Sequence, residues 1–169
     1  MPPKASPIRS FAPIADARAH TLILGSMPGA ASLRAGQYYA HRQNQFWRIM
    51  AELLGWPPDL SYATRIEALR GRRIALWDVL QSCVRPGSLD AAITDEMPND
   101  FAKFFRAHAD IERVFFNGAK AEASFRKHGG REKFPDLHYT RLPSTSPAHA
   151  GMSFRQKLAA WAPTVSSTQ

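Results

Sequence analysis

Three short segments of this sequence combine residues that bend the backbone with side chains that can contact a flat polar ligand. Segment 25–32 reads Gly-Ser-Met-Pro-Gly-Ala-Ala-Ser, segment 37–47 reads Gln-Tyr-Tyr-Ala-His-Arg-Gln-Asn-Gln-Phe-Trp, and segment 142–150 reads Leu-Pro-Ser-Thr-Ser-Pro-Ala-His-Ala. Glycine and proline in the first segment allow a sharp turn and a close backbone approach to a ligand. Aromatic rings in the second can stack on an extruded base while amides read its edge. Hydroxyls and backbone amides in the third can contact phosphates.

The first and third segments also have a purely structural interpretation. Segment 25–32 is typical of a turn between a strand and a helix. It lacks the Gly-x-Gly-x-x-Gly spacing of dinucleotide-binding loops and the lysine of a P-loop, so a nucleotide fingerprint is a weak interpretation. Segment 142–150 on its own is equally typical of a turn stiffened by prolines.

The aromatic segment divides into a loop part and a helical part. Tyr38 and Tyr39 lie in the loop and are the better candidates for stacking on a base. Phe46 and Trp47 begin a stretch with helical spacing, which is typical of residues in a core. Asn44 stands directly before that stretch, where it could simply cap the helix.

The elements around these segments predict an α/β fold. Apolar runs over 21–24, 73–79, 113–116 and 137–142 predict strands, and the stretches 44–54, 62–69, 100–108, 119–128 and 153–161 have helical spacing. Strands that alternate with helices favour a three-layer α/β/α sandwich with a central four-stranded parallel sheet. Ligands of such sheets bind beyond the carboxyl ends of the strands, so the loops that follow the strands should form the site. We expect a single domain over 15–163, with loosely ordered ends at 1–14 and 164–169.

Composition limits the class of protein and its partners. The 22 Lys and Arg residues against 14 Asp and Glu give a net charge of +8, which favours a polyanionic partner such as DNA, although basic proteins without this function are common. No apolar run reaches the ~18 residues of a membrane span, and no signal sequence is visible, so we expect a cytoplasmic monomer. Cys83, the single cysteine, excludes an internal disulfide and is expected to be a small buried hydrophobe. The spacing of Cys and His predicts neither a metal site nor a cofactor.

Taken together and in this order, the three segments resemble the motifs of the uracil-DNA glycosylase superfamily. Segments 25–29 and 39–47 occupy the places of Gly-Ile-Asn-Pro-Gly and Phe-Ala-His-Pro-x-Asn-x-Phe-Trp in the mismatch-specific uracil-DNA glycosylases. The water-activating Asn or Asp of that motif falls on Met27, which cannot orient water. The hypoxanthine-DNA glycosylase branch also lacks this polar residue, and the chain is most similar to that branch. The similarity extends to segments 77–80, 87–90 and 116–118 and covers residues from about 20 to 160.

The resemblance implies a function and a role for each matching residue. It implies a monofunctional DNA glycosylase that flips a deaminated base, hypoxanthine from deoxyinosine, out of DNA and hydrolyses its N-glycosidic bond, with Asn44 as the catalytic residue. An amide donor would favour the six-position oxygen of hypoxanthine over the amine of adenine. The residues implied to bind the base are Gly25, Ser26, Met27, Pro28, Tyr39, Phe46 and Asn117, and those implied to bind DNA are Ser32, His41, Ser144, Thr145, Ser146, Pro147, Ala148 and His149.

Alternatives remain open at the level of sequence. The chain could excise uracil or mismatched pyrimidines, bind damaged DNA without catalysis, or bind nucleotides unrelated to DNA. Asp78 is equally well interpreted as a site residue or as an acidic residue that caps a turn. No lysine lies inside the motifs, so lyase chemistry is not expected, and Lys120 is the residue to mutate as a control.

We predict that binding to duplex DNA weakens steeply with salt, because the net positive charge should act through phosphate contacts. Four such contacts would lower the affinity roughly 100-fold between about 50 and 200 mM monovalent salt. A titration of fluorescent duplex at several salt concentrations measures this slope. An affinity that does not change over this range would remove the electrostatic argument.

Overall fold

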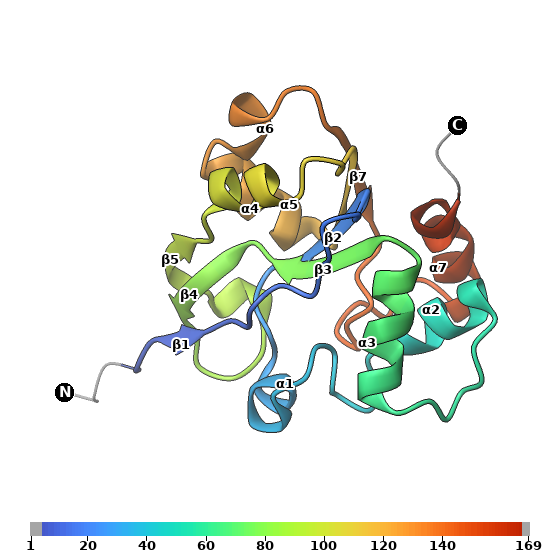
Figure 1. The fold of residues 1–169 in the computed structure, drawn as a ribbon. Coiled ribbons are helices and arrows are strands. Elements are labelled where there is room, and N and C mark those ends of the chain that lie inside the picture. The colour runs from blue at the N-terminus through green and yellow to red at the C-terminus, as the bar shows by residue number, and fades with distance from the viewer. Residues whose placement is uncertain (1–4, 167–169) are drawn as a thin grey trace.

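The computed structural model describes residues 5–166, and its centre is a four-stranded parallel sheet (Figure 1). The strands lie in the order β3-β2-β6-β7, with every neighbouring pair parallel. Their bounds are β2 (Thr21–Gly25), β3 (Ile74–Asp78), β6 (Arg113–Asn117) and β7 (His138–Leu142). The predicted four-stranded parallel sheet is therefore confirmed.

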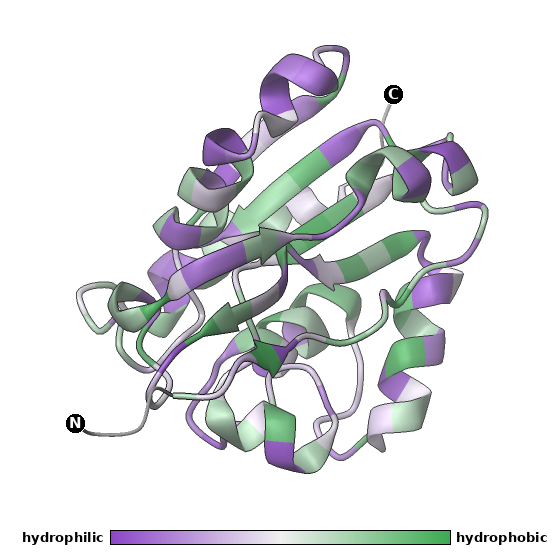
Figure 2. Cartoon of the chain, turned by 90° about the vertical axis from the view of Figure 1, so that its left-hand side faces the viewer, coloured by the Kyte–Doolittle hydropathy of each residue, from purple (hydrophilic) through white to green (hydrophobic). Residues whose placement is uncertain are grey.

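Alternating apolar side chains on these strands form two cores, one on each face of the sheet. Leu22, Leu24 and Phe116 belong to one core, whereas Ile23 and Phe115 belong to the other. The apolar colour of the strands inside the molecule is visible in Figure 2. Helices α4 (Phe101–Ala107) and α5 (Ala119–Lys127) cover the first face, and α2 (Phe46–Leu54), α3 (Tyr62–Gly71) and α7 (Phe154–Trp161) cover the second. The three-layer arrangement is confirmed as well.

Several elements were not predicted. A second, antiparallel sheet joins β1 (Ile8–Arg9), β4 (Leu80–Val84) and β5 (Thr94–Pro98). Its strands lack continuous apolar runs, and the β4–β5 register shifts twice, so no period marks them in the sequence. The short elements α1 (Ala30–Ala35), α6 (Gly130–Lys133), η1 (Asp90–Ala92) and η2 (Ala162–Val165) were also missed.

The expectation of loosely ordered ends is wrong for the parts of the ends that the structure describes. Ile14 exchanges two backbone hydrogen bonds of 2.8 Å with Leu76 and is buried. Strand β1 pairs with β4, and Thr164 near the other end is fully buried. The proline-rich segment has no hydrophobic periodicity that would predict an ordered element. Its order comes from backbone pairing with the edge of β3. Residues 1–4 and 167–169 of the expected loose ends lie outside the described residues. Within 5–166, no helix has the length and apolar character needed to cross a membrane.

Candidate functional site

The parallel register brings the ends of the strands, and with them the three segments, to one edge of the sheet. Gly25 pairs with Asp78, and Asn117 pairs with Leu142. The segments are also hydrogen-bonded to one another: the Gln45 N–H donates to the Thr145 carbonyl at 3.0 Å. The expected convergence of these loops is therefore present in the structure.

Asp78 and Tyr39 place two buried polar atoms above Gly25. A Cβ on Gly25 would lie 2.4 Å from Asp78 Oδ1 and 2.9 Å from the Tyr39 hydroxyl, so only glycine leaves room for both. Asp78 Oδ2 and the Tyr39 hydroxyl are buried and have no hydrogen-bond partner among the described residues. A buried polar group without a partner is costly, so this pair marks a place where a ligand or water belongs.

The surroundings of Asp78 also favour the neutral form of its carboxyl. Burial, assisted by the negative charge of Asp90 and opposed by Arg85, raises the pKa of Asp78 to about 7. Asp90 is itself fixed by the Ser26 hydroxyl, which donates to its Oδ1 at 2.7 Å. Burial and the Asp78 charge likewise raise the pKa of the Tyr39 hydroxyl, opposed by the nearby Asn117 amide, which lies outside hydrogen-bonding geometry. Asp78, left open at the level of sequence, thus lies in the site; its position at the end of a buried strand was the one signal available.

Asn117 ties the last strand loop to the end of β6. Its Oδ1 accepts the Thr145 N–H at 2.9 Å, and its Nδ2 donates to Thr145 Oγ1 at 2.9 Å. Because a backbone N–H can only donate, the orientation of the amide is fixed. Thr145 is fully buried by this contact. The expectation that Thr145 contacts DNA is therefore wrong, and both the oxygen and the nitrogen of the Asn117 amide already have a partner within the protein.

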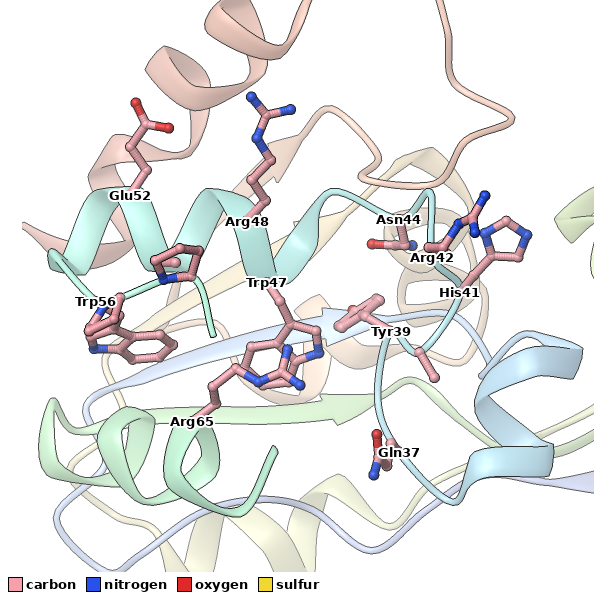
Figure 3. Close-up of a pocket in the computed structure, with 14 residues that line it drawn as sticks. Gln37, Tyr39, His41, Arg42, Asn44, Trp47, Arg48, Glu52, Trp56 and Arg65 are labelled. Atoms are coloured by element: carbon pink, nitrogen blue, oxygen red, sulfur yellow. The ribbon is translucent and has the colours of Figure 1, made fainter. Parts of the chain in front are cut away.

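Asn44 lies at the start of α2 with one end of its amide engaged and the other free. Its Oδ1 accepts the Phe46 N–H at 3.0 Å, which satisfies a donor of the first helical turn. The N-cap position itself belongs to Gln45, so Asn44 satisfies this donor from one residue before the cap. The Nδ2 group has no partner among the described residues, and Asn44 lines a cavity together with Tyr39 (Figure 3).

The two neighbouring tyrosines have different surroundings. Tyr38 is buried, and its hydroxyl donates to the Ala12 carbonyl at 2.9 Å, so it belongs to the core. Tyr39 has a positive φ of 55°, a conformation that is rare for tyrosine and that turns its ring into the site. One face of this ring packs on Phe46 at 4.2 Å between centroids. Phe46 is completely buried, so it supports Tyr39 and cannot contact a base as expected.

In the first segment, the backbone lies close to the site, whereas most side chains pack or form hydrogen bonds within the protein. Met27 is buried in the apolar core on the α4 and α5 face. The Pro28 carbonyl accepts from the guanidinium of buried Arg85 at 2.6 Å. Ser32 is buried, and its hydroxyl accepts the Ala40 N–H at 3.0 Å. Ser32 therefore shapes the loop before Tyr39, and the expectation that it contacts DNA directly is wrong.

The third segment forms an accessible loop. Ser144 and Ser146 are half-buried and accept backbone N–H groups within the loop, whereas Pro147, Ala148 and His149 are exposed. The ammonium of buried Lys157 donates to the His149 carbonyl at 2.7 Å and so fixes the loop to α7.

His41 adds a second accessible imidazole, on the segment before α2. It is exposed, and its Nδ1 accepts the Gln43 N–H at 3.1 Å, which leaves its Nε2–H free to donate. For a metal, no group of three His, Cys, Asp or Glu side chains gathers anywhere in 5–166.

Comparisons with known proteins agree with this arrangement. The model of the uracil DNA glycosylase superfamily matches residues 12–163. Two proteins named hypoxanthine DNA glycosylase, from Methanosarcina barkeri and Methanosarcina acetivorans, are 39% and 38% identical to the chain over 114 residues, which is 67% of this chain and 72% of each relative. A solution NMR structure from Methanosarcina acetivorans, described as a candidate uracil DNA glycosylase, superposes with a TM-score of 0.76 at 32% identity and covers 94% of this chain and 99% of that one. The resemblance inferred from the motifs is confirmed: this chain belongs to the uracil DNA glycosylase superfamily.

Proposed function

We propose that this protein is a DNA glycosylase that flips hypoxanthine out of DNA and hydrolyses the bond between the base and deoxyribose. Its relatives named hypoxanthine DNA glycosylase support this substrate. The observation that carries the proposal is the pair of buried, unpartnered polar atoms on Asp78 and Tyr39 at the carboxyl edge of the sheet. A flipped base would supply the partner that the Asp78 carboxyl lacks, and the Tyr39 ring would supply its stacking surface.

The neutral Asp78 carboxyl is complementary to the edge of hypoxanthine. Its O–H can donate to O6 of the base, and its carbonyl oxygen can accept N1–H. Burial raises the pKa of this carboxyl to about 7, so a large share of it carries the proton near neutral pH, as a donor must. The ring face of Tyr39 opposite Phe46 stacks on the base.

Bond cleavage needs a placed water and a stabilised leaving group rather than a strong nucleophile. The C1′–N9 bond breaks with its electron pair moving into the base, water oxygen bonds to C1′, water loses a proton, and the base takes one up. The Nδ2 group of Asn44 orients the water, and the Asp78 O–H stabilises charge on O6. Ser144, Ser146, His41 and His149 hold the flanking phosphates.

Asn44→Ala should lower the single-turnover rate of hypoxanthine excision by ~100-fold or more, because one preorganised polar group is lost. It should also cost about 1 kcal/mol of stability, because the Phe46 N–H loses its acceptor. Asn44→Ser is the matched control: its hydroxyl can accept the same N–H and restore stability, but it does not reach the substrate. A normal rate in folded Asn44→Ala would remove Asn44 from catalysis.

Asp78→Asn should change the pH dependence of both stability and rate. The pKa of Asp78 is raised in the folded state, so its carboxyl destabilises the fold as pH rises from about 4 to 7, and the penalty persists above that. The variant should match the wild type near pH 4 and be more stable at pH 8 by on the order of 1–4 kcal/mol. Its amide mimics the neutral carboxyl, so excision should continue while the decline of the wild-type rate above pH 7 disappears.

Thermal unfolding and single-turnover excision between pH 5 and 9 check both parts. A variant less stable than the wild type at pH 8 would mean that the carboxylate has favourable partners in the fold. The same decline of rate above pH 7 in Asp78→Asn would assign that decline to another group.

Excision should continue at its full rate after treatment with EDTA, because the proposed hydrolysis uses only water and protein groups. The assay incubates a deoxyinosine duplex with dialysed protein and cleaves the abasic product with alkali. Activity that disappears with EDTA and returns with a divalent ion would contradict this mechanism.

A further inference from the structure

A cavity of about 570 Å³ continues from the proposed excision site along α2, and the excision chemistry does not use most of it. It begins at Asn44 and Tyr39, passes Trp47 with Arg65 beside it, and reaches Trp56 at its other end (Figure 3). We refer to it as the α2 cavity. Its size is typical of pockets that bind nucleotide-sized ligands.

The lining of the α2 cavity is strongly cationic. Arg42, Arg48 and Arg65 line it against one carboxylate, Glu52. None of the three arginines forms an ion pair with a carboxylate of the described residues. Arg65 is partly desolvated: burial lowers its pKa, and its Nε atom is buried without a partner. An anion beside Arg65 would supply the partner that its guanidinium lacks.

The middle and the far end of the cavity carry aromatic surface (Figure 3). The Arg65 guanidinium lies 4.7 Å from the centroid of the Trp47 ring, which holds it against the wall. Trp56 is half-buried at the far end, followed by Pro57 and Pro58, which restrict the local backbone. A guanidinium followed along the cavity by an accessible indole offers a contact for a phosphate and a surface for a stacked base.

We infer that the α2 cavity binds the nucleotide that adjoins the flipped one on the damaged strand, with Arg65 at its phosphate and Trp56 against its base. The inference rests on the proposed function, because Asn44 and Tyr39 line the cavity and also belong to the proposed excision site. The chain's net charge of +8 favours the same polyanionic ligand.

The test compares duplexes that contain deoxyinosine beside an intact neighbour with duplexes in which that neighbour is replaced by a baseless spacer, on the 5′ or the 3′ side in turn. Affinity is measured by fluorescence anisotropy. For the wild type, the spacer on one side should weaken binding about tenfold, because one stacked base is lost. Trp56→Ala should bind both duplexes with the same affinity, equal to that of the wild type for the spacer duplex. It should excise at the wild-type rate when the enzyme saturates the DNA.

Arg65→Gln tests the phosphate contact without removing an aromatic ring from the fold. It should weaken binding to every duplex and reduce the salt slope by about one. Arg106→Ala is the matched control, since Arg106 is exposed on α4, on the opposite side of the sheet, and should leave the preference for an intact neighbour unchanged. Unfolding temperatures show whether each variant is folded.

Three outcomes would overturn the inference. Trp56→Ala and Arg65→Gln could both bind like the wild type, in which case the cavity does not contact the strand. They could lower the saturated excision rate, which would place the flipped base itself in the cavity. The two substitutions could abolish the binding of a free deoxynucleotide monophosphate and leave the affinity for DNA unchanged. That result would assign the cavity to a free nucleotide. Failure to excise any base, with the spacer effect on binding intact, would instead contradict the proposed function alone.

Discussion

The parallel pairing of β2 with β3 and β6 is the interaction on which the arrangement of the site depends. It fixes Gly25 opposite Asp78 and ends all central strands at the same edge. Since successive side chains on a strand point to opposite faces, a shift of one residue would turn Asp78 away from Gly25. The apolar cores on both faces hold this register, because the same shift would exchange the residues that each core buries.

The site combines polar groups that are satisfied with polar groups that are not. Asn117 and Thr145 complete each other's hydrogen bonds and hold the third segment rigidly against β6. Asp78 and Tyr39 are buried beside them with unpartnered atoms, and Tyr39 adopts a rare backbone conformation. Both features lower stability, and such features are kept where a ligand needs them. Preorganised binding of a flipped base requires a rigid support around the few polar groups that lower the stability of the fold.

The sequence predicts the parts of the fold that have a strong period and the motifs that cluster beside them. Strands β2, β3 and β6 contain continuous apolar stretches, whereas the bulged strand β4 alternates irregularly and was missed. Tyr38 and Tyr39 are indistinguishable by residue type; the positive φ of Tyr39 separates them. The motif resemblance implies that Ser32 and Thr145 bind DNA, but tertiary contacts bury both. Burial of a polar side chain depends on residues distant in the sequence, so local patterns do not reveal it.

The most direct test of this account is a crystal structure of the protein with a duplex that contains 2′-fluoro-2′-deoxyinosine, whose electron-withdrawing fluorine slows cleavage of the glycosidic bond. We expect hypoxanthine to stack on Tyr39, with O6 and N1 within about 3.2 Å of the Asp78 carboxyl. Asn44 Nδ2 should lie within hydrogen-bond reach of a water near C1′. A base bound elsewhere, with the Asp78 carboxyl still unpartnered or bonded only within the protein, would contradict the proposed function of this site.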